Sequence, residues 1–260
     1  MKKLDKPKKN DIVKELMQNI EQIIKRHYVI GDVHASGKEL FALIEKIGPK
    51  ADDEIILVGD VFDRGFHGKM VWNLIQKNNL TVLRGNHEQK MLAFLKGERD
   101  SVPTHYHWVL NDLINTSRIV TKDDLISYLE SLPILIERNN ALIAHAGVNI
   151  LNPTEPNISC NVYGNPTPFD RRPGQKWWEQ YEMDQMVVYG HLIPKDLKPM
   201  FAKNSRGIVN SVCIDTAVCH GHQITAFCIE TKEIIQYQSG IDHFSLLKQE
   251  MRKNPPLFKL

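Results

Sequence analysis

The sequence has little charge imbalance and no long apolar run. Its 33 Lys and Arg residues nearly balance its 31 Asp and Glu residues, so the net charge of +2 offers no basic field that argues for nucleic acid. No apolar stretch approaches the roughly 20 residues that a helix needs to cross a bilayer, and the N-terminus lacks the apolar segment of a secretion signal. We therefore expect a cytoplasmic protein with neither a nucleic acid nor a membrane as its partner.

Cysteine is also scarce, and no two cysteines have C-x-x-C spacing. Scattered cysteines of this kind are typical of reduced thiols in a reducing compartment. A zinc site within 213–222 is the alternative, because two cysteines and two histidines lie close together there. Strand-like alternation makes the same residues equally good neighbours on adjacent strands. They are Cys213, Cys219, His220 and His222.

The 260 residues, of which 42% are hydrophobic and 25% charged, are enough for one domain with its own core. Residues 1–10 carry many lysines and are predicted to form a disordered basic tail. A single domain is predicted over 11–260, because nothing in the sequence requires a second one. It begins with apolar residues at helical spacing, which indicate an amphipathic helix at 11–26.

Two segments interrupt the short predicted strands. Polar helical stretches at about 97–131 are predicted to form an insertion beside the sheet, with His105 and His107 on its surface. Residues 149–176 are rich in Pro, Asn and Gly, and long loops in compact domains tend to be functional. The residues of this region that would either shape a substrate mouth or only pack are Asn161, Tyr163 and Trp177.

Five short apolar runs each stop at polar residues, at 28–30, 55–58, 80–83, 141–144 and 186–190. The first two runs are joined by a helix for which Ser36 is the predicted N-cap, and this βαβ unit favours parallel strands. Parallel strands end on one edge of a sheet, where open α/β sheets bind ligands. The polar residues that follow the runs are Asp32, His34, Asp60, Asn86, His87, His145 and His191.

Carboxylate, amide and imidazole groups together are the ligand set of a divalent metal such as manganese, iron or zinc. Any single polar residue after a strand can be explained by a structural role alone, such as a helix cap or a surface ion pair. Explaining every one of the runs in this way is much harder. Cysteine is absent from the set, which argues against a closed structural zinc site.

The same residues form a pattern that resembles the metallophosphoesterase superfamily. The Asp-Arg-Gly and Asn-His-Glu blocks look most like its serine/threonine phosphoprotein phosphatase branch, with bacterial and phage members and the related symmetrical diadenosine tetraphosphatases. The resemblance implies an α/β fold, a central β-sandwich of two mixed sheets flanked by helices. The blocks are Gly31-Asp32-Val33-His34, Gly59-Asp60-Val61-Phe62-Asp63-Arg64-Gly65, Arg84-Gly85-Asn86-His87-Glu88, His145-Ala146-Gly147 and Gly190-His191.

The resemblance also implies a role for each matched residue. Asp32 and His34 would bind one divalent ion, and Asp60 would bridge it to a second, with manganese expected and iron or zinc as alternatives. The ligands of the second ion would be Asn86, His145 and His191. A hydroxide bridging the two ions would then attack phosphorus directly.

Further residues of the pattern would act on the substrate. His87 would be the general acid, oriented by Asp63, and Arg64 would hold a phosphate oxygen. A second phosphate-binding arginine is expected from Arg171 or Arg172, although their surroundings do not match the family motifs closely.

Three functions follow as hypotheses. The first is a two-metal phosphatase of phosphomonoesters on phosphoserine, phosphothreonine or phosphotyrosine proteins, or on small phosphoesters. The second is a symmetrical dinucleoside polyphosphate hydrolase, and the third is a catalytically silent module that binds a phosphorylated partner. Loop 149–176 would separate the two enzymes, because an adenine needs an aromatic or apolar slot and a phosphopeptide needs an open groove.

Overall fold

The computed structural model describes residues 25–116, 118–169 and 176–255. The predicted tail at 1–10, the predicted helix at 11–26 except for its last two residues, and both Arg171 and Arg172 lie outside the described residues. These predictions therefore stay predictions. None of the helices in the described ranges combines the length and the apolar character that a membrane-spanning helix needs.

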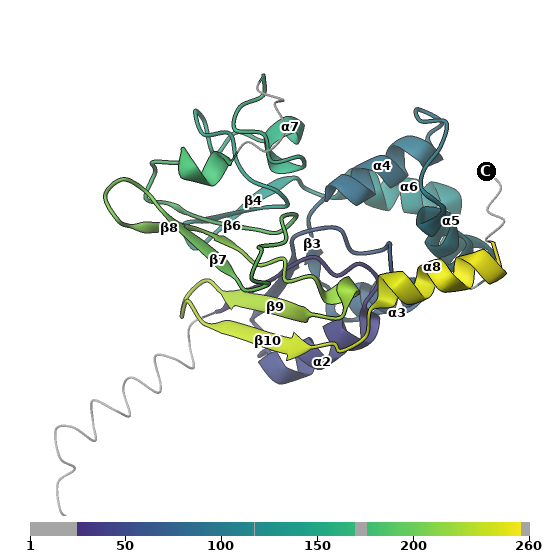
Figure 1. Ribbon diagram of the computed structural model, residues 1–260. Helices are drawn as coiled ribbons and strands as arrows, with labels where there is room; N and C mark the ends of the chain where they lie inside the picture. Colours follow the sequence, from purple (N-terminus) through teal and green to yellow (C-terminus); the bar gives the residue numbers. More distant parts are fainter. Residues whose placement is uncertain (1–24, 117, 170–175, 256–260) are drawn as a thin grey trace, which may run out of the picture.

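Two mixed five-stranded sheets form the centre of the fold (Figure 1). The first has the order β10-β9-β1-β2-β3 and the second β4-β5-β6-β8-β7. In the first sheet β1, β2 and β3 are parallel, and in the second β5, β6 and β8 are parallel. The strands are β1 (His27–Ile30), β2 (Glu54–Leu57), β3 (Thr81–Val82), β4 (Leu135–Arg138), β5 (Ala141–Ala144), β6 (Met186–Tyr189), β7 (Met200–Lys203), β8 (Val209–Cys213), β9 (Gln223–Cys228) and β10 (Ile234–Gln238).

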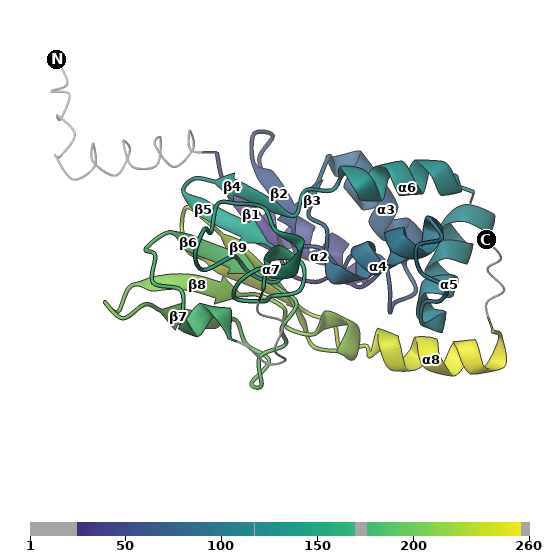
Figure 2. The ribbon, with the colours of Figure 1, turned by 90° about the horizontal axis from the view of Figure 1, so that it is seen from above.

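Helices flank the sheets, as the α/β sandwich predicted from the sequence requires. Figure 2 shows α4, α5, α6 and α8 gathered at one end of the molecule, away from most of the strands. The α-helices are α2 (Gly37–Ile47), α3 (Gly68–Asn78), α4 (Asn86–Leu95), α5 (Thr104–Leu110), α6 (Lys122–Ser131), α7 (Ile158–Asn161) and α8 (His243–Lys253). Shorter turns are the π-helix Asn111–Thr116 and the 3-10 helices Trp177–Glu179 and Val218–His220.

The core follows from the two-residue period of the strands. Val29 and Ile56 face the second sheet, where Val188 and Val212 meet them in one buried cluster. The alternate residues of the first sheet, such as Ile30, pack against the helices in a second cluster. The inner strands therefore have two apolar faces, which explains why their runs in the sequence are continuous rather than alternating.

The connection from β1 to β2 and the start of α2 match the predictions from the sequence. The βαβ unit is present, with β1 parallel to β2 and α2 ending at Gly48 in the left-handed conformation. Asn139 and Asn140 both have positive φ and join β4 to β5 in a two-residue hairpin. Ser36 occupies the predicted N-cap position of α2, although its side chain makes no capping hydrogen bond.

Helices α5 and α6 lie in the segment 97–131. The prediction that its histidines are surface groups is wrong for His105, whose Nε2 is buried and 3.2 Å from Asp63 Oδ2. The edge strand β7 and the C-terminal helix α8 are among the elements that the sequence patterns did not predict.

Candidate active site

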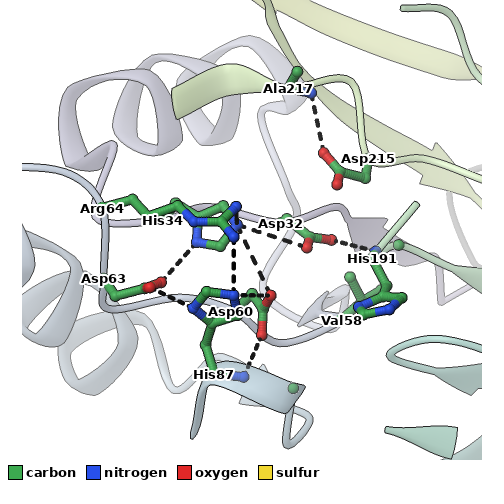
Figure 3. A network of polar contacts seen from close by, with 12 residues as sticks. Asp32, His34, Val58, Asp60, Asp63, Arg64, His87, His191, Asp215 and Ala217 are labelled. Atoms are coloured by element: carbon green, nitrogen blue, oxygen red, sulfur yellow. Dashed lines mark hydrogen bonds and ion pairs between the residues drawn. The ribbon is translucent and has the colours of Figure 1, made fainter. Parts of the chain in front are cut away.

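The candidate metal ligands lie at the carboxyl ends of strands in both sheets. Asp32 and His34 follow β1, Asp60 follows β2, Asn86 begins α4 after β3, His145 follows β5 and His191 follows β6. Because the parallel strands of the two sheets end on the same side, the structure brings these side chains together, as Figure 3 shows for several of them.

Asp60 lies between two groups of candidate ligands. On one side, His34 Nε2 is 3.8 Å from Asp60 Oδ2 and 3.9 Å from Asp32 Oδ2. On the other side, His145 Nε2 is 3.5 Å from Asp60 Oδ1 and 3.2 Å from His191 Nδ1. In each group the ligand atoms lie within 4.8 Å of one another. The two oxygens of one carboxylate therefore face two different candidate cation sites.

Two further observations fit these residues to divalent cations. The Oδ1 atom of Asn86 is buried and has no hydrogen-bond partner among the described residues, which is costly for an amide oxygen unless a ligand satisfies it. His145 Nδ1 lies 3.1 Å from the carbonyl oxygen of Val58, and this contact directs the lone pair of Nε2 into the pocket. The oxygen and nitrogen donors thus suit a pair of divalent cations.

Asp63 connects two histidines of the site. Its Oδ2 accepts a hydrogen bond from His87 Nδ1, and its Oδ1 lies 2.7 Å from His34 Nδ1. Burial alone would raise the pKa of Asp63, but His87 and His34 hold that pKa well below its usual range. Burial alone would lower the pKa of His87, yet Asp63 and Asp60 raise it above its usual value. A charged imidazole beside an ionised carboxylate is the arrangement of a general acid.

Comparison with known families agrees with this geometry. Residues 25–226, most of the chain, match the family model described as calcineurin-like phosphoesterase.

The chain belongs to the calcineurin-like phosphoesterase family.

Curated relatives in this family include dinucleotide hydrolases. The asymmetrical bis(5'-nucleosyl)-tetraphosphatase PrpE of Oceanobacillus iheyensis is 27% identical over 240 residues, which cover 81% of this chain and 91% of the relative. The protein of the same name from Bacillus velezensis is 24% identical over 240 residues, covering 83% of this chain and 93% of the relative.

Solved structures with low sequence identity share the fold. A candidate diadenosine tetraphosphatase superposes with a TM-score of 0.63 and 20% identity, covering 84% of this chain and 95% of its own. A serine/threonine phosphatase from Saccharomyces cerevisiae with similarity to human phosphatase PP5 has a TM-score of 0.52 and 14% identity, covering 84% of this chain and 80% of its own.

The family match confirms the predicted superfamily, the predicted fold and the predicted class of enzyme. This calcineurin-like phosphoesterase is a hydrolase of a family that uses divalent metals. The roles of individual residues remain predictions, and the metal's identity is a further one.

The electrostatics of this phosphoesterase site favour bound cations. Burial and neighbouring carboxylates raise the pKa of Asp60 to about 7, and burial with the nearby Asp215 raises the pKa of Asp32. Burial lowers the pKa of His34 to about 3 and that of His191 to about 4, so the imidazoles are neutral and able to bind metal. A cation pair would supply the positive charge that the buried carboxylates lack.

Unusual backbone conformations cluster at the site. His34, Asp60 and His191 all have positive φ, at 46°, 52° and 65°, which is strained for residues other than glycine. Glu88 stabilises the turn at Asp60 by accepting hydrogen bonds from the backbone N–H groups of Asp60 (2.7 Å), Val61 (2.9 Å) and Gly85 (3.0 Å). The buried Glu88 carboxylate therefore holds the bridging candidate in place.

Arg64 points into the pocket rather than to the surface (Figure 3). Its Nη1 lies 3.0 Å from His34 Nε2, and its Nη2 lies 3.1 Å from His87 Nε2. The guanidinium is also 5.6 Å from the ring centroid of Phe244 on α8. Its place between a candidate metal ligand and the candidate acid suits the predicted contact with a phosphate oxygen.

Sequence reasoning missed several residues of the site. Glu88 stood in the quoted Asn-His-Glu block without a role, and Asp215 was not among the candidate site residues. His105 and Tyr106 reach the site from α5, and no local pattern could have placed them there. Of the residues at the predicted mouth, Trp177 packs in the core, where its Nε1 donates to Ala146 O at 2.9 Å.

The alternative zinc site gains no support in the described part of the chain. Cys213 lies in β8, and its thiol is 3.0 Å from the carbonyl oxygen of Leu192. None of the candidate metal groups found among the described residues contains Cys213, Cys219, His220 or His222.

Proposed function

We propose that this protein hydrolyses the phosphoric anhydride of dinucleoside polyphosphates at a site that holds two divalent cations. The position of Asp60 between two ligand groups carries the two-cation part of the proposal. The dinucleotide part rests on the curated relatives, whose names are those of tetraphosphatases and whose alignments cover more than four fifths of the chain. This reverses the order of the hypotheses drawn from the sequence, which put a phosphoprotein first.

Two sets of residues would hold the cations, with manganese as the expected metal. Asp32, His34 and Asp60 would bind one ion. Asp60 would also bind the second ion, together with Asn86, His145 and His191. Bound ions of this kind lower the pKa of water and neutralise the charge of a phosphate group.

The chain's own residues would then position the substrate and move a proton. Arg64 would hold a nonbridging phosphate oxygen with its forked donors. As the oxygen of water adds to phosphorus, the bond from phosphorus to the leaving oxygen breaks and its electron pair stays on that oxygen. His87 Nε2 would give its proton to this oxygen, while Asp63 holds the imidazole through Nδ1. The proton lost by water would restore His87.

A cavity in the segment predicted to distinguish the substrates supports a nucleotide. It has a volume of about 850 Å³, and its apolar lining includes Ile158 and Tyr163. Tyr163 precedes Gly164, where a Cβ would lie 3.3 Å from the carbonyl oxygen of Ala146, the residue after His145. The ring of Tyr163 is half-exposed and lines this cavity, and an exposed aromatic ring suits the stacking of a nucleobase.

The proposal is tested by comparing kcat/KM in manganese for diadenosine tetraphosphate, a phosphopeptide and p-nitrophenyl phosphate. We expect the dinucleotide to be preferred by at least about tenfold, a difference of 1.4 kcal/mol in transition-state binding. Product analysis identifies the bond cleaved, because ATP with AMP marks asymmetrical cleavage and two ADP marks symmetrical cleavage. Preference for the phosphopeptide would make the phosphoprotein phosphatase the favoured hypothesis again. No turnover with any substrate would support the silent binding module.

A further inference from the structure

Helix α5 places an aromatic side chain directly on the candidate acid. The ring of Tyr106 stacks on His87, with centroids 5.6 Å apart and 10° between the planes. Its hydroxyl oxygen lies 2.8 Å from His87 Nδ1. Tyr106 is buried, with 1% of its surface exposed, so it is held in this position by its surroundings.

These contacts restrict the one rotation that Asp63 leaves open. A hydrogen bond at Nδ1 anchors one atom of the imidazole but lets the ring tilt about that anchor. A ring stacked nearly parallel to it opposes the tilt, and His87 Nε2 then stays in the pocket, 3.6 Å from Asp60 Oδ2. His105 supports Tyr106 from its neighbouring position, with ring centroids 4.8 Å apart.

Tyr106 is placed to position His87 but not to replace it. Its hydroxyl faces Nδ1, whereas the proposed proton transfer uses Nε2 on the other side of the ring. Burial and the nearby carboxylates raise the pKa of Tyr106 above its usual value, so the hydroxyl keeps its proton.

We propose that Tyr106 is a positioning residue that fixes the ring plane of His87 for proton transfer to the leaving group, an inference that rests on the proposed role of His87 as the acid. The segment 97–131 then contributes directly to turnover. A misaligned acid slows the reaction most when the leaving group needs its proton, and least when the leaving group departs easily as an anion.

The test compares phenyl phosphate, which has a poor leaving group, with p-nitrophenyl phosphate, which has a good one. Tyr106→Leu should lower kcat on phenyl phosphate by about 10- to 100-fold and on p-nitrophenyl phosphate by less than about 5-fold, with metal content and KM unchanged. Tyr106→Phe keeps the stacked ring and should stay within about 3-fold of the wild type on both substrates.

Two reference variants complete the design. Tyr128 lies in the same segment but packs against Phe62 and Trp72. Tyr128→Leu should therefore show no split, meaning no difference between the losses of kcat on the two substrates. His87→Asn should show a larger split than Tyr106→Leu. If Tyr106→Leu does not fold, Tyr106→Met, which also removes the stacked ring, must show the same split.

Failure of the inference and failure of the proposed acid give different results. Equal losses on both substrates in Tyr106→Leu, or a similar split in Tyr128→Leu, overturn the inference while the acid stands. Absence of a split in His87→Asn overturns the proposed acid, and the inference falls with it.

Discussion

The contacts of Asp63 lead to a prediction that separates metal binding from proton transfer. Its carboxylate orients the candidate ligand His34 with one oxygen and the candidate acid His87 with the other. Asp63→Asn replaces one acceptor oxygen with an amide donor, so the two imidazoles can no longer both donate to this side chain. Loss of a carboxylate that orients a metal-binding histidine typically costs about 10- to 100-fold in metal affinity. Loss of a positioned general acid costs about 10²- to 10⁴-fold in rate.

We therefore expect Asp63→Asn to be impaired in both metal binding and proton transfer, and His87→Asn to be impaired in proton transfer only. With saturating manganese the two variants should have similarly low kcat. With limiting manganese Asp63→Asn should lose a further 10- to 100-fold, because its affinity for the ion at His34 is lower. Titration of activity with manganese, together with direct measurement of metal content, checks both expectations. Wild-type manganese affinity in Asp63→Asn would refute the assignment of His34 as a ligand oriented by Asp63.

Three other predictions concern the bridge, the cavity and stability. Asp60→Asn should deplete both metal ions and Asn86→Ala only one, as measured by elemental analysis of the purified protein. Tyr163→Ala should lower kcat/KM for diadenosine tetraphosphate by about 10-fold or more and leave p-nitrophenyl phosphate unaffected. Tyr237→Ala, a similarly exposed tyrosine on β10, should change neither. Burial alone would raise the pKa of Glu54, but hydrogen bonds from Arg138 lower that pKa to about 2. The ionised carboxylate therefore stabilises the fold fully above the usual pKa of a glutamate, and this contribution is lost as pH falls from about 5 to 2. Denaturant unfolding should show Glu54→Gln about 1–3 kcal/mol less stable than the wild type at pH 7, with the gap closing in acid; a constant gap would contradict this.

The sequence by itself determined the parts of this protein that local chemistry controls. Short apolar runs that end at glycine placed Asp32 and Asp60 at strand ends, and the crossover helix made their strands parallel. The hairpin at Asn139 followed from a pair of residues that tolerate positive φ. These features depend on side chains only a few positions apart, so their signal survives in a linear sequence.

Only the tertiary structure decided how distant segments complete the site. Tyr106 comes from a polar segment without a strand-like pattern, and it reaches His87 because α5 is packed beside α4 and α8. Phe244 reaches Arg64 from the far end of the chain in the same way. Such contacts depend on the packing of whole helices, and the free energy of that packing is spread over many side chains. No single residue pattern therefore announces them in advance.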